Sequence, residues 1–343
     1  MPRRTVRLLL SVLVLPALLQ PVGGTAAGPT GLDGDATFGD YDTLSAGPEL
    51  ARRSLSPLNA LRLRAQIPTG RMIDLAREHF TLYVPAEAPP GGYGLLVFVS
   101  PWPSAPLPAH WAPILDRHGM IFVSAANAGN DAHTFERREP LALLAAHNVM
   151  MRYPVDPGRV YVGGFSGGAR VAERLALAYP DLFRGALLAA GSDPIGEALP
   201  LPPADLLRRF QESSRLVYLT GARDEFHAAE DRRSQQSMRG WCVFGLSSEI
   251  MPWSGHDEAD PAALDRAFDD LAKPAPGRDS AALKDCRARV EQDLATQVRQ
   301  VEVSLADGKR DAAWALLVKL DARFGGLAAA RTLDLAAKLA ASP

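Results

Sequence analysis

The sequence predicts an α/β protein: a mostly parallel, doubly wound sheet with helices on both faces and a small helical appendage at the C-terminal end. From His79 onward, short apolar runs typical of strands alternate with helical patterns. Such alternation indicates parallel strands joined by helical crossovers. In addition, a Gly-x-Ser-x-Gly motif at residues 164–168 separates one apolar run from a helical pattern, as in a sharp strand-to-helix turn.

Seven apolar runs are expected to form the sheet, at residues 80–84, 95–99, 120–123, 160–162, 186–189, 216–219 and 248–251. Because these runs are short and apolar throughout, we expect the strands to be buried on both faces. Helices are expected around residues 57–65, 139–152, 167–179, 228–239 and 261–272.

The first 27 residues have the pattern of a secretory signal peptide. A basic start with Arg3, Arg4 and Arg7 precedes an apolar stretch over residues 8–19, and Thr25-Ala26-Ala27 provides a small-residue cleavage site. The apolar stretch is too short to span a bilayer, so no stable membrane insertion is expected after cleavage. The sequence therefore predicts a secreted or periplasmic protein.

Three further segments follow the signal peptide. Residues 28–75 form an N-terminal lead-in whose first part, residues 28–47, is rich in Gly, Asp and Thr and is expected to be flexible. Residues 76–275, which hold the alternating strand and helix patterns and the Gly-x-Ser-x-Gly motif, are expected to form the main domain, the candidate for any catalytic function. Residues 276–343 are expected to form three packed helices without a catalytic-looking cluster. This appendage either stabilises the domain or offers a surface to a protein partner.

Length and composition bound the class of protein. A chain of 343 residues with 47% hydrophobic content can bury a substantial core. Its formal net charge is −2, and loss of the three signal-peptide arginines makes it −5, with opposite charges interspersed. Such a surface is not built to hold nucleic acid. After export, the two cysteines, Cys242 and Cys286, form either a disulfide or two separate buried thiols.

Ser166, at the centre of the Gly-x-Ser-x-Gly motif, is the candidate nucleophile. A serine on such a turn sits in a strained backbone conformation, and Gly164 and Gly168 let neighbouring segments pass closely. The turn aims the amide of Gly167 and the positive end of the following helix at the site of attack. A serine hydroxyl is a weak nucleophile, so a base must take its proton and an acid must orient that base.

Asp224 and His256 are the predicted acid and base. Each follows an apolar strand, at residues 216–219 and 248–251 respectively, and is expected on the exit loop of that strand. Loops at the carboxyl ends of parallel strands meet at one edge of the sheet, where Ser166 also lies. The order Ser, Asp, His along the chain is the order found in sheet-based serine hydrolases.

Other assignments stay open at this stage. Alternatives to Asp224 as the acid are Glu225, Asp231 and Asp257. His227, on the loop of the acid itself, is an alternative base, and two histidines on earlier strand-exit loops are candidates to line the pocket, His110 and His133.

An oxyanion hole needs two hydrogen-bond donors. One is expected to be the amide of Gly167, and the other is expected from the loop after residues 95–99. Since Pro101 lacks an N–H, the amide of Trp102 is the first one beyond Ser100 that can serve. The alternative is that Trp102 only caps the core.

Taken together, residues 155–168, the Thr220-Gly221-x-x-Asp224 loop and Gly255-His256 resemble the α/β-hydrolase superfamily, in particular its secreted polyhydroxybutyrate-depolymerase-like and feruloyl-esterase-like branch. The resemblance covers residues 76–275. It implies cleavage of a small-molecule or oligomeric ester through an acyl-enzyme, with no metal or organic cofactor. Where those relatives carry His-Gly after the third strand, this chain has Ser100-Pro101.

Two other functions share the same motif. A serine peptidase similar to prolyl oligopeptidase would use the same turn, although its large gating domain is absent from this sequence. A catalytically silent binding protein would keep the fold while its oxyanion loop had changed. The leading prediction is an exported serine esterase.

Overall fold

The computed structural model describes residues 28–275 and 280–341, so the predicted signal peptide lies outside the described residues. Eight strands form one sheet: β1 (Gly31–Ala36), β2 (Phe80–Val84), β3 (Tyr93–Val99), β4 (Met120–Ala125), β5 (Val155–Phe165), β6 (Gly185–Ala189), β7 (Arg215–Gly221) and β8 (Leu246–Met251). The helices of the domain are α1 (Gly47–Ser54), α2 (Pro57–Leu63), α3 (Ala112–His118), α4 (Glu139–Arg152), α5 (Gly167–Ala178), α6 (Ala204–Ser213), α7 (Glu225–Gly240) and α8 (Pro261–Ala272). Short turns of helix lie at η1 (Leu75–Arg77) and η2 (Thr134–Arg138).

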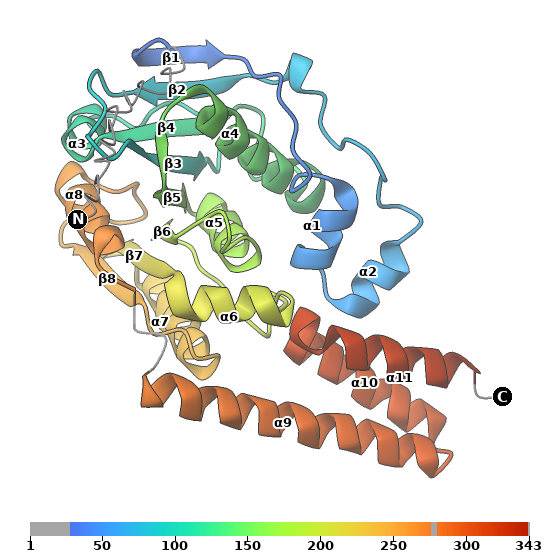
Figure 1. The fold of residues 1–343 in the computed structure, drawn as a ribbon. Helices are drawn as coiled ribbons and strands as arrows, with labels where there is room; N and C mark the ends of the chain where they lie inside the picture. The colour runs from blue at the N-terminus through green and yellow to red at the C-terminus, as the bar shows by residue number, and fades with distance from the viewer. Residues whose placement is uncertain (1–27, 276–279, 342–343) are drawn as a thin grey trace, which may run out of the picture.

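The strands lie in the order β1-β2-β4-β3-β5-β6-β7-β8 (Figure 1). β2 runs antiparallel to both of its neighbours. The other six strands, β4, β3, β5, β6, β7 and β8 in spatial order, run parallel to one another. Each of the seven predicted runs falls within one of the strands β2 to β8, and the five predicted helices correspond to α2, α4, α5, α7 and α8. The prediction of a mostly parallel α/β sheet is confirmed.

The first part of the N-terminal lead-in is more ordered than the sequence predicts. Residues 28–47 were expected to be flexible, but Gly31–Ala36 form β1 and pair with β2 at the edge of the sheet. Five of the six residues of β1 are exposed, so this strand has no apolar run that marks it in the sequence. Its order comes from the backbone hydrogen bonds that the open edge of β2 offers.

Two hydrophobic cores lie on the two faces of the sheet. Successive side chains of a strand point to opposite faces, so in β3 Leu95, Val97 and Val99 enter one core while Leu96 and Phe98 enter the other. α4, α5 and α6 cover the first face, and α3 and α8 cover the second (Figure 1). The sequence did not predict α1, α3 and α6.

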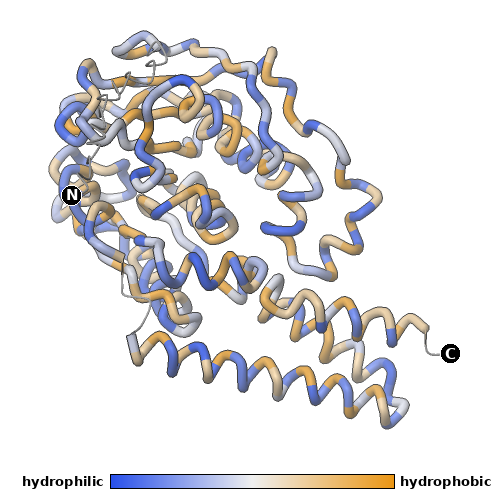
Figure 2. Tube along the Cα trace, in the orientation of Figure 1, coloured by the Kyte–Doolittle hydropathy of each residue, from blue (hydrophilic) through white to orange (hydrophobic). Residues whose placement is uncertain are grey.

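The C-terminal appendage consists of the three predicted helices, α9 (Ala281–Ala306), α10 (Arg310–Phe324) and α11 (Ala329–Ala341), with a short 3-10 turn η3 (Gly325–Ala328). Hydrophobic residues recur along them (Figure 2). Their buried side chains are continuous with the first core of the sheet. Among the described residues, no helix is both long and apolar enough to cross a bilayer.

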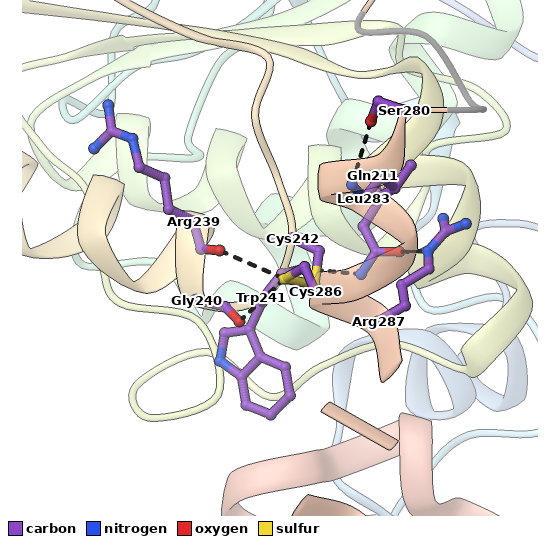
Figure 3. Close-up of a disulfide and its surroundings, with 9 residues drawn as sticks. All are labelled: Gln211, Arg239, Gly240, Trp241, Cys242, Ser280, Leu283, Cys286 and Arg287. Atoms are coloured by element: carbon purple, nitrogen blue, oxygen red, sulfur yellow. Dashed lines mark hydrogen bonds between the residues drawn. A yellow bond between two sulfur atoms is a disulfide. The ribbon is translucent and has the colours of Figure 1, made fainter. Parts of the chain in front are cut away.

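A disulfide ties the appendage to the α/β domain. Cys242 at the end of α7 and Cys286 in α9 are bonded, with Cα atoms 5.7 Å apart (Figure 3). Arg287 reinforces the junction by donating to Gln211 Oε1, whose own amide donates to the carbonyl of Trp241. Of the two states that the sequence left open for the cysteines, the structure has the disulfide.

Candidate active site

Ser166 lies between β5 and α5 in the strained conformation that the motif predicts. Its φ of 53° and ψ of −123° are unusual for a residue with a side chain. The Ser166 N–H donates to the carbonyl of Ala189 in β6 (2.8 Å), and this bond holds the turn against the sheet. The hydroxyl is therefore fixed at the carboxyl edge of the strands.

The glycines around Ser166 make room for this turn. A Cβ on Gly168 would collide with the carbonyl oxygen of Val99 at the end of β3. A Cβ on Gly164 would collide with the backbone of Gly168 and lie 2.7 Å from the amide nitrogen of Ala169. The predicted reason for both glycines, close passage of neighbouring segments, is confirmed.

Asp224 and His256 are placed by two loops that lie against each other. The loop after β7 contacts the loop after β8, because Arg223 N–H donates to the carbonyl of Ser254 (3.1 Å). Gly221 allows this approach, since its Cβ would lie 2.7 Å from the carbonyl carbon of Ser254. Asp224 is the N-cap of α7, and His256 follows on the facing loop.

These three predicted residues meet in one hydrogen-bonded chain. His256 Nε2 lies 3.0 Å from Ser166 Oγ, and His256 Nδ1 lies 2.7 Å from Asp224 Oδ2. The side chain of Asp224 is only 7% exposed, whereas that of His256 is 41% exposed and open to a substrate. The arrangement matches what removal of the serine proton requires.

A second histidine shares the acid. His227 Nδ1 lies 2.8 Å from both oxygens of Asp224, and the His227 ring stacks on the His256 ring with centroids 4.3 Å apart. Burial pushes the pKa of Asp224 up, but hydrogen bonds from His227 and His256 outweigh it, and the pKa lies below its ordinary value. Asp224 is thus a carboxylate at neutral pH, and both Nδ1 atoms must carry protons.

The remaining candidates do not take the positions predicted for the acid and the base. His227 contacts the acid rather than Ser166, and Asp231 bonds to Ser192 and Thr220 inside the domain. Asp257 accepts from the amide of Gly255, on its own loop. The structure gives three further candidates no bond to the triad, namely Glu225, His110 and His133.

The two predicted oxyanion donors, the amides of Gly167 and Trp102, differ in their hydrogen-bonding surroundings. The amide of Gly167 is at the first position of α5, where a helix leaves the N–H without an intrahelical partner. The amide of Trp102, in contrast, donates to Ser100 Oγ (3.1 Å), so it is already engaged in this structure. The expected second donor therefore has a different partner.

Arg138 was not predicted and holds this region together. It is 4% exposed, and its guanidinium donates to the carbonyls of Ala128 (2.8 Å), Ser100 (3.1 Å) and Gly167 (3.4 Å). The three carbonyls belong to the loop after β4, the loop after β3 and the start of α5. No pattern in the sequence marks an arginine whose partners are carbonyls of distant loops.

Among the described residues, Asp224, His227 and His256 are the one group that offers three potential metal-ligand atoms within 4.8 Å. The Nδ1 atoms of His227 and His256 lie 2.8 and 2.7 Å from the same oxygen of Asp224, Oδ2. The same atoms already serve as hydrogen-bond donors to Asp224. The geometry fits a hydrogen-bonded triad better than a metal centre.

The sheet order and the site together decide the fold. Ser166 stands between the central strand β5 and α5, Asp224 follows β7 and His256 follows β8, and the three side chains are joined by hydrogen bonds. The chain has the α/β-hydrolase fold. Its three C-terminal helices are added after the last strand of that fold.

No model of a protein family and no curated protein matches the sequence. Solved structures that it resembles include a thermostable esterase (14% identity, TM-score 0.43), with 58% of this chain and 59% of that chain covered. They also include an S-formylglutathione hydrolase from Staphylococcus aureus (14% identity, TM-score 0.45; 57% and 93% covered) and dipeptidyl peptidase 4 from Porphyromonas gingivalis (12%, 0.41; 57% and 33%). The fold is assigned from the strand order and the site, not from these distant likenesses.

Proposed function

We propose that this α/β-hydrolase cleaves carboxylic esters through an acyl-enzyme. The observation that carries the proposal is the chain of hydrogen bonds from Ser166 through His256 to Asp224. Ser166 Oγ attacks the ester carbonyl carbon as His256 Nε2 takes the hydroxyl proton. Asp224 holds the imidazole in position and stabilises the positive charge that it gains.

The second half of the reaction uses the same groups. His256 returns its proton to the leaving alkoxide as the ester C–O bond breaks, which releases the alcohol and leaves an acyl group on Ser166. A water molecule then attacks the acyl carbon while His256 takes a proton from it. When the tetrahedral intermediate collapses, Ser166 regains its proton and the carboxylic acid leaves.

The surroundings of the triad favour an apolar or aromatic ester. Three exposed aromatic rings come from the loop after β3, the first turn of α7 and the loop after β8: Trp102 (45% exposed), Phe226 (67%) and Trp253 (82%). The Trp102 ring lies tilted against the Phe165 ring (centroids 5.6 Å apart), and the Phe165 ring lies 4.8 Å from the His256 ring. Exposed aromatic rings beside a reactive group provide apolar contact area for an acyl or aromatic group.

We also propose that the protein acts outside the cytoplasm, secreted or in the periplasm. A disulfide between Cys242 and Cys286 supports this location, because disulfides persist in oxidising compartments. Mass spectrometry of the protein recovered from culture supernatant or periplasm would test it. An intact residue 1 in that fraction would contradict removal of a signal peptide.

A fluorophosphonate probe tests the catalytic proposal. It should modify Ser166 in the folded protein and leave Ser166→Ala unmodified, and Ser166→Ala should lose hydrolysis of p-nitrophenyl esters. Ser254→Ala is the matched control, because Ser254 lies on the His256 loop and, among the residues that the structure describes, its hydrogen bonds run through backbone atoms. Equal hydrolysis by wild type and Ser166→Ala would refute the proposal. Cleavage of aminoacyl anilides but not of esters would point to a peptidase instead.

A further inference from the structure

The loop after β3 leaves the oxyanion hole one donor short. Its sequence is Ser100-Pro101-Trp102-Pro103, and the two prolines have no N–H. The amide of Trp102 donates to Ser100 Oγ (3.1 Å). If the proposed ester hydrolysis is correct, the Gly167 amide needs a second donor from another segment.

Asn130, on the loop after β4, places its carboxamide against the start of α5. A Cβ built on Gly167 would lie 2.9 Å from Asn130 Cγ and 3.1 Å from Nδ2, and it would collide with Oδ1. The absence of a side chain at Gly167 therefore lets the carboxamide approach the residue directly after the nucleophile. Within residues 28–275 and 280–341, no hydrogen bond engages this carboxamide.

The backbone of Asn130 is held in place. Its amide donates to the carbonyl of Pro101 (2.9 Å), and the amide of Asn127 donates to the carbonyl of Pro103 (2.7 Å). The buried Arg138 joins this loop to the β3 loop and to α5 through three carbonyls. A polar side chain that is free to donate thus stands on a fixed backbone beside the nucleophile.

We propose that the Asn130 side chain is the second oxyanion donor, with Nδ2–H bonding the oxygen that becomes negative when Ser166 attacks. This role rests on the proposed ester hydrolysis and adds a catalytic residue to it. A carboxamide donates one hydrogen bond without changing charge and turns readily about its terminal torsion.

The resting orientation agrees with this role. Oδ1 is the carboxamide atom nearest to the position that a Cβ on Gly167 would occupy, at the positive end of the α5 dipole. When an oxyanion forms beside the Gly167 amide, negative charge occupies that place and the carboxamide presents Nδ2 instead. Gly167 supplies one donor from its backbone, and the space left by its missing side chain admits the other.

Substitutions at Asn130 separate a donor from a packing role. Asn130→Asp has nearly the same shape but carries a negative charge, and Asn130→Ala removes the group. We expect kcat for a p-nitrophenyl ester to fall about 10²-fold in Asn130→Ala and at least as far in Asn130→Asp, with KM nearly unchanged. A packing role would instead leave Asn130→Asp close to wild type. Asp131→Ala, the exposed neighbour on the same loop, is the control and should keep wild-type kcat.

Gly167→Ala provides an independent test, because it keeps the backbone amide but its methyl group displaces the Asn130 side chain. We expect it to lose kcat as Asn130→Ala does, and the double variant to lose no more than either single variant. Full additivity of the two losses would overturn the proposal.

Rates of fluorophosphonate labelling distinguish a failure of the proposed ester hydrolysis from a failure of the proposed role of Asn130. If the wild type leaves the probe unreacted, ester hydrolysis fails and the Asn130 role fails with it. If the wild type reacts and Asn130→Ala reacts equally fast, only the Asn130 role is refuted. Slow labelling of Asn130→Ala with an unchanged melting temperature would support it.

Discussion

The buried carboxyl group of Glu173 should make the stability of this protein depend on pH. It lies in α5 with no exposed surface, where Oε2 accepts from the Asp193 amide (2.6 Å) and Oε1 accepts from Ser234 Oγ (2.7 Å). Burial raises the pKa of Glu173 to about 8, and the nearby carboxylates of Asp193 and Asp231 add to the rise. Glu173 is therefore mostly protonated at neutral pH.

The size of the effect follows from linkage. The pKa rises from 4.5 in the unfolded chain to about 8 in the folded one, and each unit is worth about 1.4 kcal/mol. Because the folded state holds the proton more tightly, this stability is present below pH 4.5 and is lost as the pH rises to about 8. The total loss is about 4–5 kcal/mol.

Glu173→Gln should remove this pH dependence. The glutamine mimics the protonated acid: its Oε1 can accept from the Asp193 amide, and its Nε2 can donate to Ser234 Oγ, which also contacts the Tyr218 hydroxyl (3.0 Å). We expect the variant to gain stability over the wild type between pH 5 and 8, by about 1.4 kcal/mol per pH unit. Urea unfolding at several pH values measures the difference.

Glu139→Gln is the matched control, because Glu139 is also fully buried but pairs with Arg174 (2.9 Å). Its substitution leaves a charge without its partner and should destabilise the protein. Unfolding free energies of Glu173→Gln and wild type that stay parallel from pH 5 to 9 would refute the reasoning about Glu173.

Three other predictions concern the junctions of the fold and the second histidine. Replacing both Cys242 and Cys286 by Ser should cost about 4 kcal/mol of unfolding free energy, because the disulfide closes a loop of 44 residues, and dithiothreitol should destabilise the wild type but not the variant. Gly325→Ala should cost more than Gly308→Ala in thermal unfolding: both glycines have positive φ, but only at Gly325 would the Cβ lie 2.7 Å from backbone atoms of Leu201, whereas Gly308 has open space. His227→Phe keeps a ring against His256 but loses the bond to Asp224, so ester kcat should fall about tenfold, and an unchanged kcat would show that one imidazole suffices.

The strands and the triad could be predicted because their causes are local. Seven strands are apolar runs bounded by turn residues, and the sharp turn at Ser166 needs its glycines next to it in the sequence. Once the sheet is parallel, residues that follow different strands, such as Asp224 and His256, must meet at one edge. The pattern therefore predicts which loops converge, while alternatives to Asp224 and His256 nearby in the sequence stayed open until the structure placed them.

The features that the sequence did not predict depend on contacts between distant segments. β1 is polar and exposed, and only its pairing with β2 makes it a strand. The sequence predicted the amide of Trp102 as an oxyanion donor, but in the structure this amide donates to the hydroxyl of Ser100. Asn130 approaches Gly167 because the loop after β4 lies against the start of α5, and no residue pattern in either segment predicts this contact.

The position of His227 follows from a local rule of helix capping. Asp224 caps α7, and the residue three positions after an N-cap lies next to the capping side chain. The sequence Asp-x-x-His at 224–227 therefore places the His227 ring beside the carboxylate, as the structure has it. His227 and His256 are not alternative bases: both donate to Asp224, and only His256 reaches Ser166 with its second nitrogen, at 3.0 Å. Reach to the serine, rather than proximity to the acid, decides which histidine can serve as the base.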